Sequence, residues 1–325
     1  MAAPALHIGP VRVDPPVMLA RMAGYTASAF RGLCLECGAG LAFPEVVTAQ
    51  GLARRSPQSL HYLETLEQEA PLAGHLYGSD PAAAAAAAAV IEENGRFALV
   101  DLNAGCPVRK IVRKGAGAAL VGDPPALQRL LTAVCERVAL PVTVKTRIGT
   151  DPEHPRAMEL LAAAEAAGAS AFFLHARHVS ARHSGPADWD LLAAVRRAAS
   201  IPVIGNGGIE RGADVPAMLR RTGVDGVLIG RAAVGNPWIF REAACLLEGR
   251  PWQPPDEGER RAMIERHLDR LVRLMTLEAR VRRRRRRSPE EAACLKFRPH
   301  LVRYLAGRPG WRAMLPALST MRSVE

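Results

Sequence analysis

Four apolar segments follow one another between residues 141 and 230: PVTVKTR (141–147), ASAFFLH (169–175), IPVIGN (201–206) and VDGVLIG (224–230). They are short, nearly continuous in apolar character and separated by helix-prone sequence, as is typical of parallel strands buried on both faces. Four similar segments precede them, at 17–22, 40–47, 71–77 and 97–103. Eight such units in about 230 residues predict a protein of the α/β class, a (β/α)8 TIM barrel.

The last quarter of the chain has a different composition. Three prolines, at 251, 254 and 255, form a linker, and helical spacing of apolar residues then runs over 257–280. Ser288-Pro289-Glu290-Glu291 is a helix-start signature, and we expect helices near 288–305 and 309–322. We therefore expect a barrel over residues 1–250, followed by a small C-terminal helical-bundle domain over residues 251–325.

The net charge of +11 is placed unevenly, because residues 251–325 carry +9 of it. A near-neutral body with a basic tail indicates a polyanionic partner such as RNA, DNA or a membrane surface. A GC-rich genome that favours arginine codons is the alternative explanation. The arginine run at 282–287 has two interpretations as well, a phosphate contact or a solvated loop.

Cysteine usage and hydropathy favour a soluble cytoplasmic protein. The six cysteines show no paired disulfide framework, we find no signal-peptide pattern, and no apolar run approaches the ~20 residues that span a bilayer. Cys34 and Cys37 have C-x-x-C spacing without a second ligand pair, so we expect them to be packing residues rather than zinc or redox groups.

Polar residues gather at the carboxyl ends of the predicted strands, where barrel enzymes carry their chemistry. The five strand ends read DLNAGCP (101–107), KTR (145–147), HAR (175–177), GNGG (205–208) and GR (230–231). The two glycine-rich ends are typical of phosphate sites built from backbone N–H groups. With Lys145 and His175 farther along the rim, they indicate an elongated phosphorylated cofactor whose ring lies over the barrel mouth.

Cys106 differs from the other cysteines because it lies on a loop, between Gly105 and Pro107, directly after a strand. A thiol at a catalytic rim suits either a proton donor or a nucleophile.

These residues resemble the tRNA-dihydrouridine synthase family. The resemblance covers about 300 residues, and its segments lie at 19–24 with Phe30-Arg31, 101–107, 114–120, 142–147, 175–177, 184–189, 201–209, 225–240 and 297–307. The N-x-G-C-P motif, in combination with the two phosphate-side blocks, is specific to this family.

The resemblance implies an FMN-dependent enzyme that reduces the C5=C6 bond of tRNA uridines with NADPH. It makes Cys106 the general acid that protonates C5, and it implies two sets of binding residues. Those toward the cofactor are Met22, Ala23, His75, Asn103, Lys145, His175, Asn206, Gly208, Gly230 and Arg231. Those toward the substrate are Asn103, Arg147, Arg177 and His183. The basic tail then grips tRNA, and we expect a monomer.

Three residues depart from the family pattern. Arg21 replaces a usual proline, His75 replaces a usual glutamine in a position expected to meet the flavin, and His183 replaces a frequent tyrosine near the substrate. Because histidine still donates a hydrogen bond, we interpret these as tuning of the site.

Two other functions fit parts of the sequence. An FMN-dependent barrel reductase of a small molecule explains the phosphate site and the cysteine but gives the basic tail no role. A non-catalytic RNA-binding barrel explains the tail and the three departures.

Overall fold

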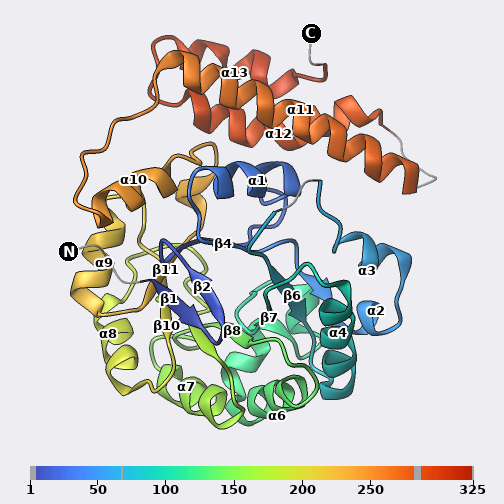
Figure 1. Cartoon of the computed structure of the whole chain (residues 1–325), viewed down its shortest axis with the longest axis vertical. Helices are drawn as coiled ribbons and strands as arrows, with labels where there is room; N and C mark the ends of the chain where they lie inside the picture. The colour runs from blue at the N-terminus through green and yellow to red at the C-terminus, as the bar shows by residue number, and fades with distance from the viewer. Residues whose placement is uncertain (1–4, 67–68, 282–286, 324–325) are drawn as a thin grey trace.

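The main sheet closes into a parallel ring in the computed structural model, which describes residues 5–66, 69–281 and 287–323 (Figure 1). Its strands are β3 (Val17–Leu19), β4 (Leu41–Ala42), β5 (Val47–Thr48), β6 (Ala73–Tyr77), β7 (Leu99–Asn103), β8 (Val142–Arg147), β9 (Ala171–His175), β10 (Val203–Asn206) and β11 (Gly226–Ile229). The first of these strands pairs with the last, Val17 opposite Val227. The predicted α/β barrel is confirmed.

The second position of the ring differs from the single strand expected at 40–47. It consists of two short strands, β4 and β5, separated by an irregular segment that contains Pro44. Proline has no N–H for a ladder hydrogen bond, so the strand breaks there. The ring still closes, because the Ala42 N–H donates to the Pro71 carbonyl at 3.2 Å and β5 pairs with β6.

Helices surround the ring on its outer face. They are α1 (Ser28–Glu36), α2 (Ala49–Ala53), α3 (Pro57–His61), α4 (Pro81–Asn94), α5 (Arg109–Val112), α6 (Pro124–Cys135), α7 (Ala157–Ala166), α8 (Trp189–Ala198), α9 (Asp214–Thr222) and α10 (Ile239–Leu247), with the 3-10 turns η1 (Gly117–Gly122) and η2 (Arg231–Ala233). The alanine-rich α4 begins where the Asp80 carboxylate accepts from the Ala82 N–H at 3.0 Å, and it ends at Gly95 with φ +72°.

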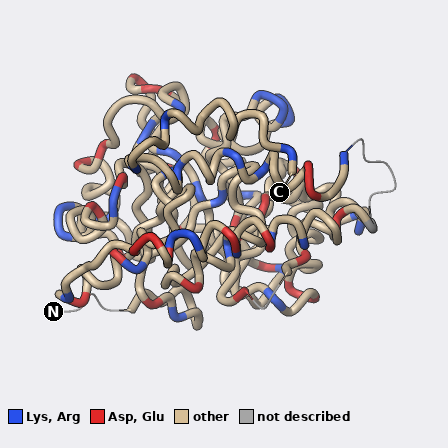
Figure 2. Tube along the Cα trace, turned by 90° about the horizontal axis from the view of Figure 1, so that it is seen from above, with Lys and Arg blue, Asp and Glu red and all other residues tan. Residues whose placement is uncertain are grey.

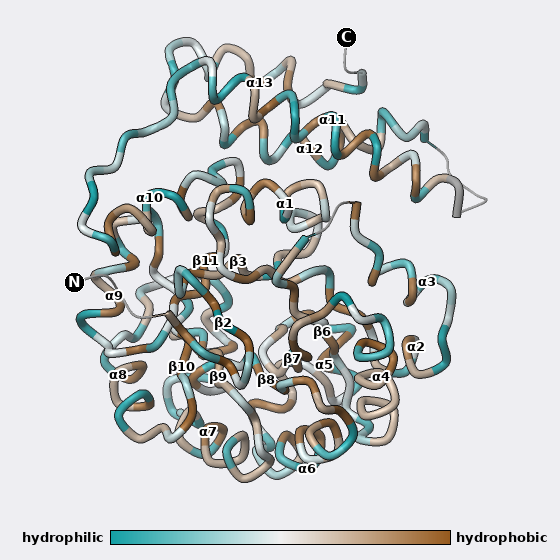
Figure 3. The backbone as a smooth tube through the Cα atoms, viewed as in Figure 1, coloured by the Kyte–Doolittle hydropathy of each residue, from teal (hydrophilic) through white to brown (hydrophobic). Residues whose placement is uncertain are grey.

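A small hairpin that the sequence analysis did not predict closes the N-terminal end of the barrel. Its strands β1 (Leu6–Ile8) and β2 (Val11–Val13) are antiparallel. Leu6, Ile8 and Val13 pack with barrel-interior residues such as Phe173. We call this end the floor, and its buried side chains are apolar. Figure 3 shows the ring strands as mostly hydrophobic tube, with helices of mixed character around them.

Three tail helices form a layer beside α1 and α10: α11 (Glu257–Val281), α12 (Pro289–Leu305) and α13 (Trp311–Thr320) (Figure 1). The helices expected at 257–280, 288–305 and 309–322 are therefore present. Phe297 and Tyr304 of α12 pack with Leu33 of α1 and with Trp238. Residues 282–286, most of the arginine run, lie outside the described residues. No helix in the described part of the chain is long and apolar enough to cross a membrane.

Candidate active site

A cavity of about 720 Å³ opens at the carboxyl ends of the barrel strands, and we call this end the mouth. Every residue predicted for the site lines it: Met22, Ala23, His75, Asn103, Cys106, Lys145, Arg147, His175, Arg177, His183, Asn206, Gly208, Gly230 and Arg231. Helix α12 adds a wall of Pro299, Val302 and Arg303. A parallel barrel brings these distant residues together because all its strands end on one side.

Asn103, the last residue of β7, holds the loop that carries Cys106. Its side-chain oxygen accepts from the Gly105 N–H at 3.2 Å and from the Cys106 N–H at 3.0 Å. On the other side of the loop, the Cys106 carbonyl accepts from the Ala118 N–H at 3.0 Å. Gly117 approaches so closely that a Cβ there would lie 2.8 Å from this carbonyl. The backbone of Cys106 is thus fixed, while its side chain remains partly exposed to the cavity.

The same amide fixes the proton of His75. Because the Asn103 oxygen faces the loop, its nitrogen faces His75 Nε2 at 3.1 Å. An amide nitrogen only donates, so Nε2 accepts and the neutral ring carries its proton on Nδ1. Burial lowers the pKa of His75 well below its usual range, as do Arg21 and Lys145, in keeping with a neutral ring. Nδ1 is buried without a partner among the described residues.

Asp101 lies beneath His75, with 3.5 Å between its Oδ2 and His75 Nε2. Its other oxygen accepts from the Thr143 hydroxyl at 2.7 Å. Burial raises the pKa of Asp101 to about 7, against the opposing effects of Thr143 and Lys145. The sequence analysis placed Asp101 in the polar strand end at 101–107 but gave it no role, although its position two residues before Asn103 on one strand places both on the same inward face.

Lys145 extends into the cavity from β8. Burial, and next Arg147, lower the pKa of Lys145 to about 7, while Asp101 and Cys106 act in the opposite direction. Within the described residues, no hydrogen bond or ion pair holds this amine. A desolvated cation without a protein partner is suited to an anionic or electron-rich ligand atom.

Arg147 and Arg177, predicted to bind substrate, use their guanidinium groups to hold the rim. Arg147 donates to the carbonyls of Gly105, His178 and Arg182 at 3.1, 3.1 and 2.6 Å. Arg177 donates to the Gly185 carbonyl at 2.9 Å. These bonds fix the loop of residues 178–185, on which the exposed His183 lies.

The opposite side of the mouth resembles an anion cradle. Gly207 and Gly208 have φ of +110° and +82°, and the exposed Arg231 donates to the His183 carbonyl at 3.2 Å. His175 is 8% exposed and its Nδ1 has no partner among the described residues. Burial lowers the pKa of His175, as do Lys145 and Arg147, so its ring is neutral.

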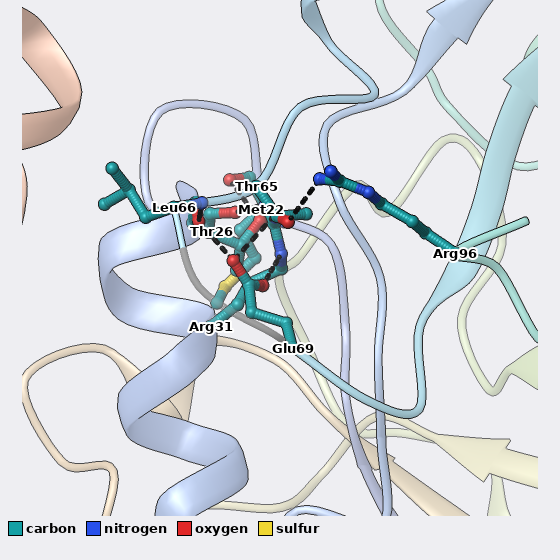
Figure 4. A network of polar contacts seen from close by, with 8 residues as sticks. Met22, Thr26, Arg31, Thr65, Leu66, Glu69 and Arg96 are labelled. Carbon is teal, nitrogen blue, oxygen red and sulfur yellow. Dashed lines mark hydrogen bonds and ion pairs between the residues drawn. The ribbon is translucent and has the colours of Figure 1, made fainter. Parts of the chain in front are cut away.

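A buried polar network anchors the loop that carries Met22 and Ala23 (Figure 4). The Arg31 guanidinium donates to Glu69 Oε2 at 2.8 Å and to the Thr26 carbonyl at 2.9 Å. The Thr26 hydroxyl in turn accepts from the Met22 N–H at 2.9 Å. The network fixes one wall of the cavity from outside the barrel.

Arg21, one of the three departures, forms an ion pair with Glu45 at 3.3 Å between the neighbouring loops after β3 and β4. Cys34 and Cys37 are buried in the core, and burial raises the pKa of both thiols, that of Cys37 to about 11. They are protonated packing residues at neutral pH.

Ion pairs engage several of the basic residues in the described tail, although basic residues still outnumber acidic ones there. Arg261 contacts Glu265 at 2.8 Å, and Arg308 contacts Glu257 at 2.6 Å. Figure 2, which views the molecule from the side of the tail helices, shows basic and acidic residues interleaved. Arg303 is exposed at the cavity, and no carboxylate of the described residues pairs with it.

The fold and site together define a barrel enzyme whose mouth is lined by imidazole, amine and guanidinium groups and is partly roofed by a helical tail. The model of the family described as "Dihydrouridine synthase (Dus)" matches residues 18–296. This chain belongs to that family.

Curated relatives are similar over most of their length. A "Probable tRNA-dihydrouridine synthase" of Mycobacterium tuberculosis (strain H37Rv) is 37% identical, over 99% of this chain and 82% of the relative. A "tRNA-dihydrouridine synthase B" of Shewanella oneidensis is 36% identical, over 82% of this chain and 83% of the relative.

Solved structures share the fold at low sequence identity. Histamine dehydrogenase from Rhizobium sp. 4-9 superimposes with a TM-score of 0.57 and 17% identity, over 82% of this chain and 50% of that chain. A 2-naphthoyl-CoA reductase gives a TM-score of 0.58 and 14% identity, over 76% of this chain and 52% of that chain. This chain thus spans about half the length of either structure, and the likeness shows the fold alone.

Proposed function

We propose that this protein is an oxidoreductase that reduces the C5=C6 bond of specific tRNA uridines to 5,6-dihydrouridine, with FMN as cofactor and NADPH as reductant. Family membership and the relatives' names support tRNA and this product. The observation that carries the flavin is the Lys145 amine, which lines the cavity and has no hydrogen-bond or ion-pair partner among the described residues.

The residues of the mouth fit FMN. The unpartnered Lys145 amine suits an electron-rich atom of the flavin ring. Asn103 and Lys145 then face the flavin ring, and Met22 and Ala23 form the wall beside it. His175 and Asn206 face the ribityl chain, and Gly208, Gly230 and Arg231 hold the phosphate.

Cys106 is the proposed general acid. When bound, reduced FMN supplies the hydride that adds to C6 of the uracil. The Cys106 thiol gives its proton to C5, so the double bond is replaced by two C–H bonds and NADPH ends as NADP⁺. The thiolate is reprotonated from water at the open mouth. Asn103 keeps the loop of Cys106 in place, and Arg147 and Arg177 act on the uridine through the rim that they fix.

The substrate uridine must leave its stack to enter the mouth. The basic tail domain, residues 251–325, is proposed to bind the surrounding RNA, and its arginine run at 282–287 to contact phosphates. We place the protein in the cytoplasm as a monomer.

Reconstitution tests this function. Purified protein is incubated with FMN, NADPH and unmodified tRNA, and dihydrouridine is measured by mass spectrometry after nuclease digestion. We expect one or a few uridine positions to be reduced. A yellow, NADPH-reducible protein that yields no dihydrouridine refutes the tRNA assignment and favours a small-molecule reductase. A colourless protein that binds tRNA favours the non-catalytic barrel.

A further inference from the structure

His300 joins the tail to two neighbouring loops at one side of the cavity. It lies on α12, is 1% exposed, and contacts two barrel loops that belong to different strands. Its Nδ1 accepts from the Gly235 N–H at 3.3 Å, in the loop after β11. Its Nε2 donates to the Tyr25 carbonyl at 3.2 Å, in the loop after β3. A neutral imidazole satisfies both bonds at once.

The loops that His300 joins are the loops of the site. Tyr25 lines the cavity, and so does Val234, the neighbour of Gly235. On α12, Pro299 and Val302 line it one residue before and two residues after His300. A shift of His300 therefore moves a wall of the cavity and the loops beside it.

Gly235 provides a second, independent observation. Its φ is +63°, and a Cβ there would lie 2.5 Å from the His300 carbonyl and 2.9 Å from the Tyr304 backbone nitrogen. The backbone of the barrel loop thus lies directly against the backbone of α12. Only glycine allows this approach without displacing the helix.

His300 differs from its buried neighbour His267, whose ring centroid lies 4.6 Å away. His267 packs on Phe30 and contacts the Tyr304 hydroxyl at 3.3 Å, but it bonds to no loop of the cavity. The two histidines share one cluster, and only His300 connects that cluster to the site.

We propose that His300 is a positioning residue that fixes α12 over the mouth and thereby sets the wall against which the incoming uridine is held. This inference rests on the proposed tRNA reduction. His300 contributes more to the use of tRNA than to the flavin chemistry, most of whose residues lie on other strands of the barrel.

The kinetic test compares His300→Gln and His300→Leu with His267→Gln. We expect kcat/KM for tRNA to fall about tenfold or more in His300→Leu and less in His300→Gln, which retains one amide for one of the two bonds. FMN content and NADPH oxidation by oxygen should fall less than kcat/KM for tRNA, because the joined loops carry only part of the proposed FMN site, such as Met22 and Arg231. Equal effects of His300→Gln and His267→Gln on tRNA reduction overturn the proposal, because the effect is then generic destabilisation.

Hydrogen–deuterium exchange of the full protein without tRNA tests whether His300 holds the two barrel loops, independently of the reaction that the protein catalyses. We expect faster exchange at residues 22–27 and 231–237 in His300→Leu, and no change there in His267→Gln. Unchanged exchange in both loops overturns the proposal. Absence of dihydrouridine from wild type, with the exchange difference present, refutes the proposed function and leaves the connection in place.

A glycine pair tests the same joint without altering a histidine. Gly235→Ala places a methyl group against α12 and should reproduce the loss in tRNA reduction. The control is Gly249→Ala, where φ is +71° but nothing lies within 4 Å of the added carbon. If both variants behave alike, backbone strain explains the result and the proposal fails.

Discussion

The two ends of the barrel are built from the same strands and have opposite chemistry. At the floor, Leu6, Ile8 and Val13 cover the ring with apolar side chains and no charge. At the mouth, the same strands end in buried imidazoles, an amine and a carboxyl group whose hydrogen bonds are incomplete within the described protein. Unpartnered buried polar groups cost stability, whereas a filled apolar floor supplies it. We infer that the floor stabilises the fold and that the mouth accepts a loss of stability in order to bind ligands.

The largest expected effect is at Cys106. We expect Cys106→Ala to lower the rate of tRNA uridine reduction about 10²–10⁴-fold, because a general acid contributes on that scale. FMN content and flavin reduction by NADPH should stay unchanged, since the loop is held by backbone bonds to Asn103 and Ala118. Single-turnover mass spectrometry measures the rate. Cys135→Ala, on α6, is the matched control, and a Cys106→Ala rate within tenfold of wild type removes Cys106 as the acid.

The floor should show the reverse response. Ile8 is fully buried, and Ile8→Ala should lower the free energy of unfolding by about 2–5 kcal/mol through lost burial and a residual cavity. FMN affinity should stay the same. Urea unfolding and fluorescence titration measure the two quantities. His7→Ala, exposed on the same strand, should change stability by less than ~0.5 kcal/mol. A loss of FMN affinity in Ile8→Ala contradicts the separation of the two ends.

Much of this contrast could be predicted from the sequence, for a physical reason. The apolar runs gave seven of the ring positions as single strands, and parallel closure then required all their polar carboxyl ends to meet. All the predicted site residues line one cavity, as the strand order alone leads one to expect. The second ring position was the exception. Pro44 breaks the strand expected at 40–47, and the apolar pattern alone does not indicate that break.

The remainder depended on backbone paths that sequence spacing does not contain. Arg147 and Arg177 remain predicted substrate-binding residues. Sequence spacing did not indicate that they also donate to the Arg182 and Gly185 carbonyls of the neighbouring loop. Val302 and Arg303 read as tail residues, and only the docking of α12 brings them to the cavity. The hairpin at the floor was too short to give a periodic signal.

Replacing Lys145 should raise the stability of the ligand-free protein and at the same time weaken ligand binding. Its folded-state pKa of about 7 lies below the ordinary value near 10.4, so between these values the unfolded chain binds more protons. The free-energy cost of burying the charged Lys145 amine is therefore fully present below pH 7 and absent above about pH 10.5. Lys145→Met should stabilise the ligand-free protein at pH 7, by about 2–4 °C for each kcal/mol, and the gain should vanish toward pH 10.5.

The same variant should weaken FMN binding about 10–100-fold, the usual range for a lost charged hydrogen bond. Thermal unfolding across pH and fluorescence titration of FMN measure the two effects. Lys110→Met, exposed on α5, is the control for removal of a positive charge. If Lys145→Met destabilises the ligand-free protein at pH 7, the contrast between the two ends does not extend to this residue.

The smallest expected effect tests whether the RNA-binding surface continues from the mouth onto the tail. Arg303 is exposed beside the cavity without a carboxylate partner in the described chain, so it is available to an RNA phosphate. Arg303→Ala should weaken tRNA binding several-fold and reduce the slope of log K against log salt by about 0.7–0.9, the value for one phosphate contact. Arg261→Ala is the control, because Arg261 is already paired with Glu265. Fluorescence anisotropy between 50 and 200 mM salt measures both slopes. Equal slopes for the two variants would place the phosphate contacts elsewhere on the tail and confine the mouth to the barrel.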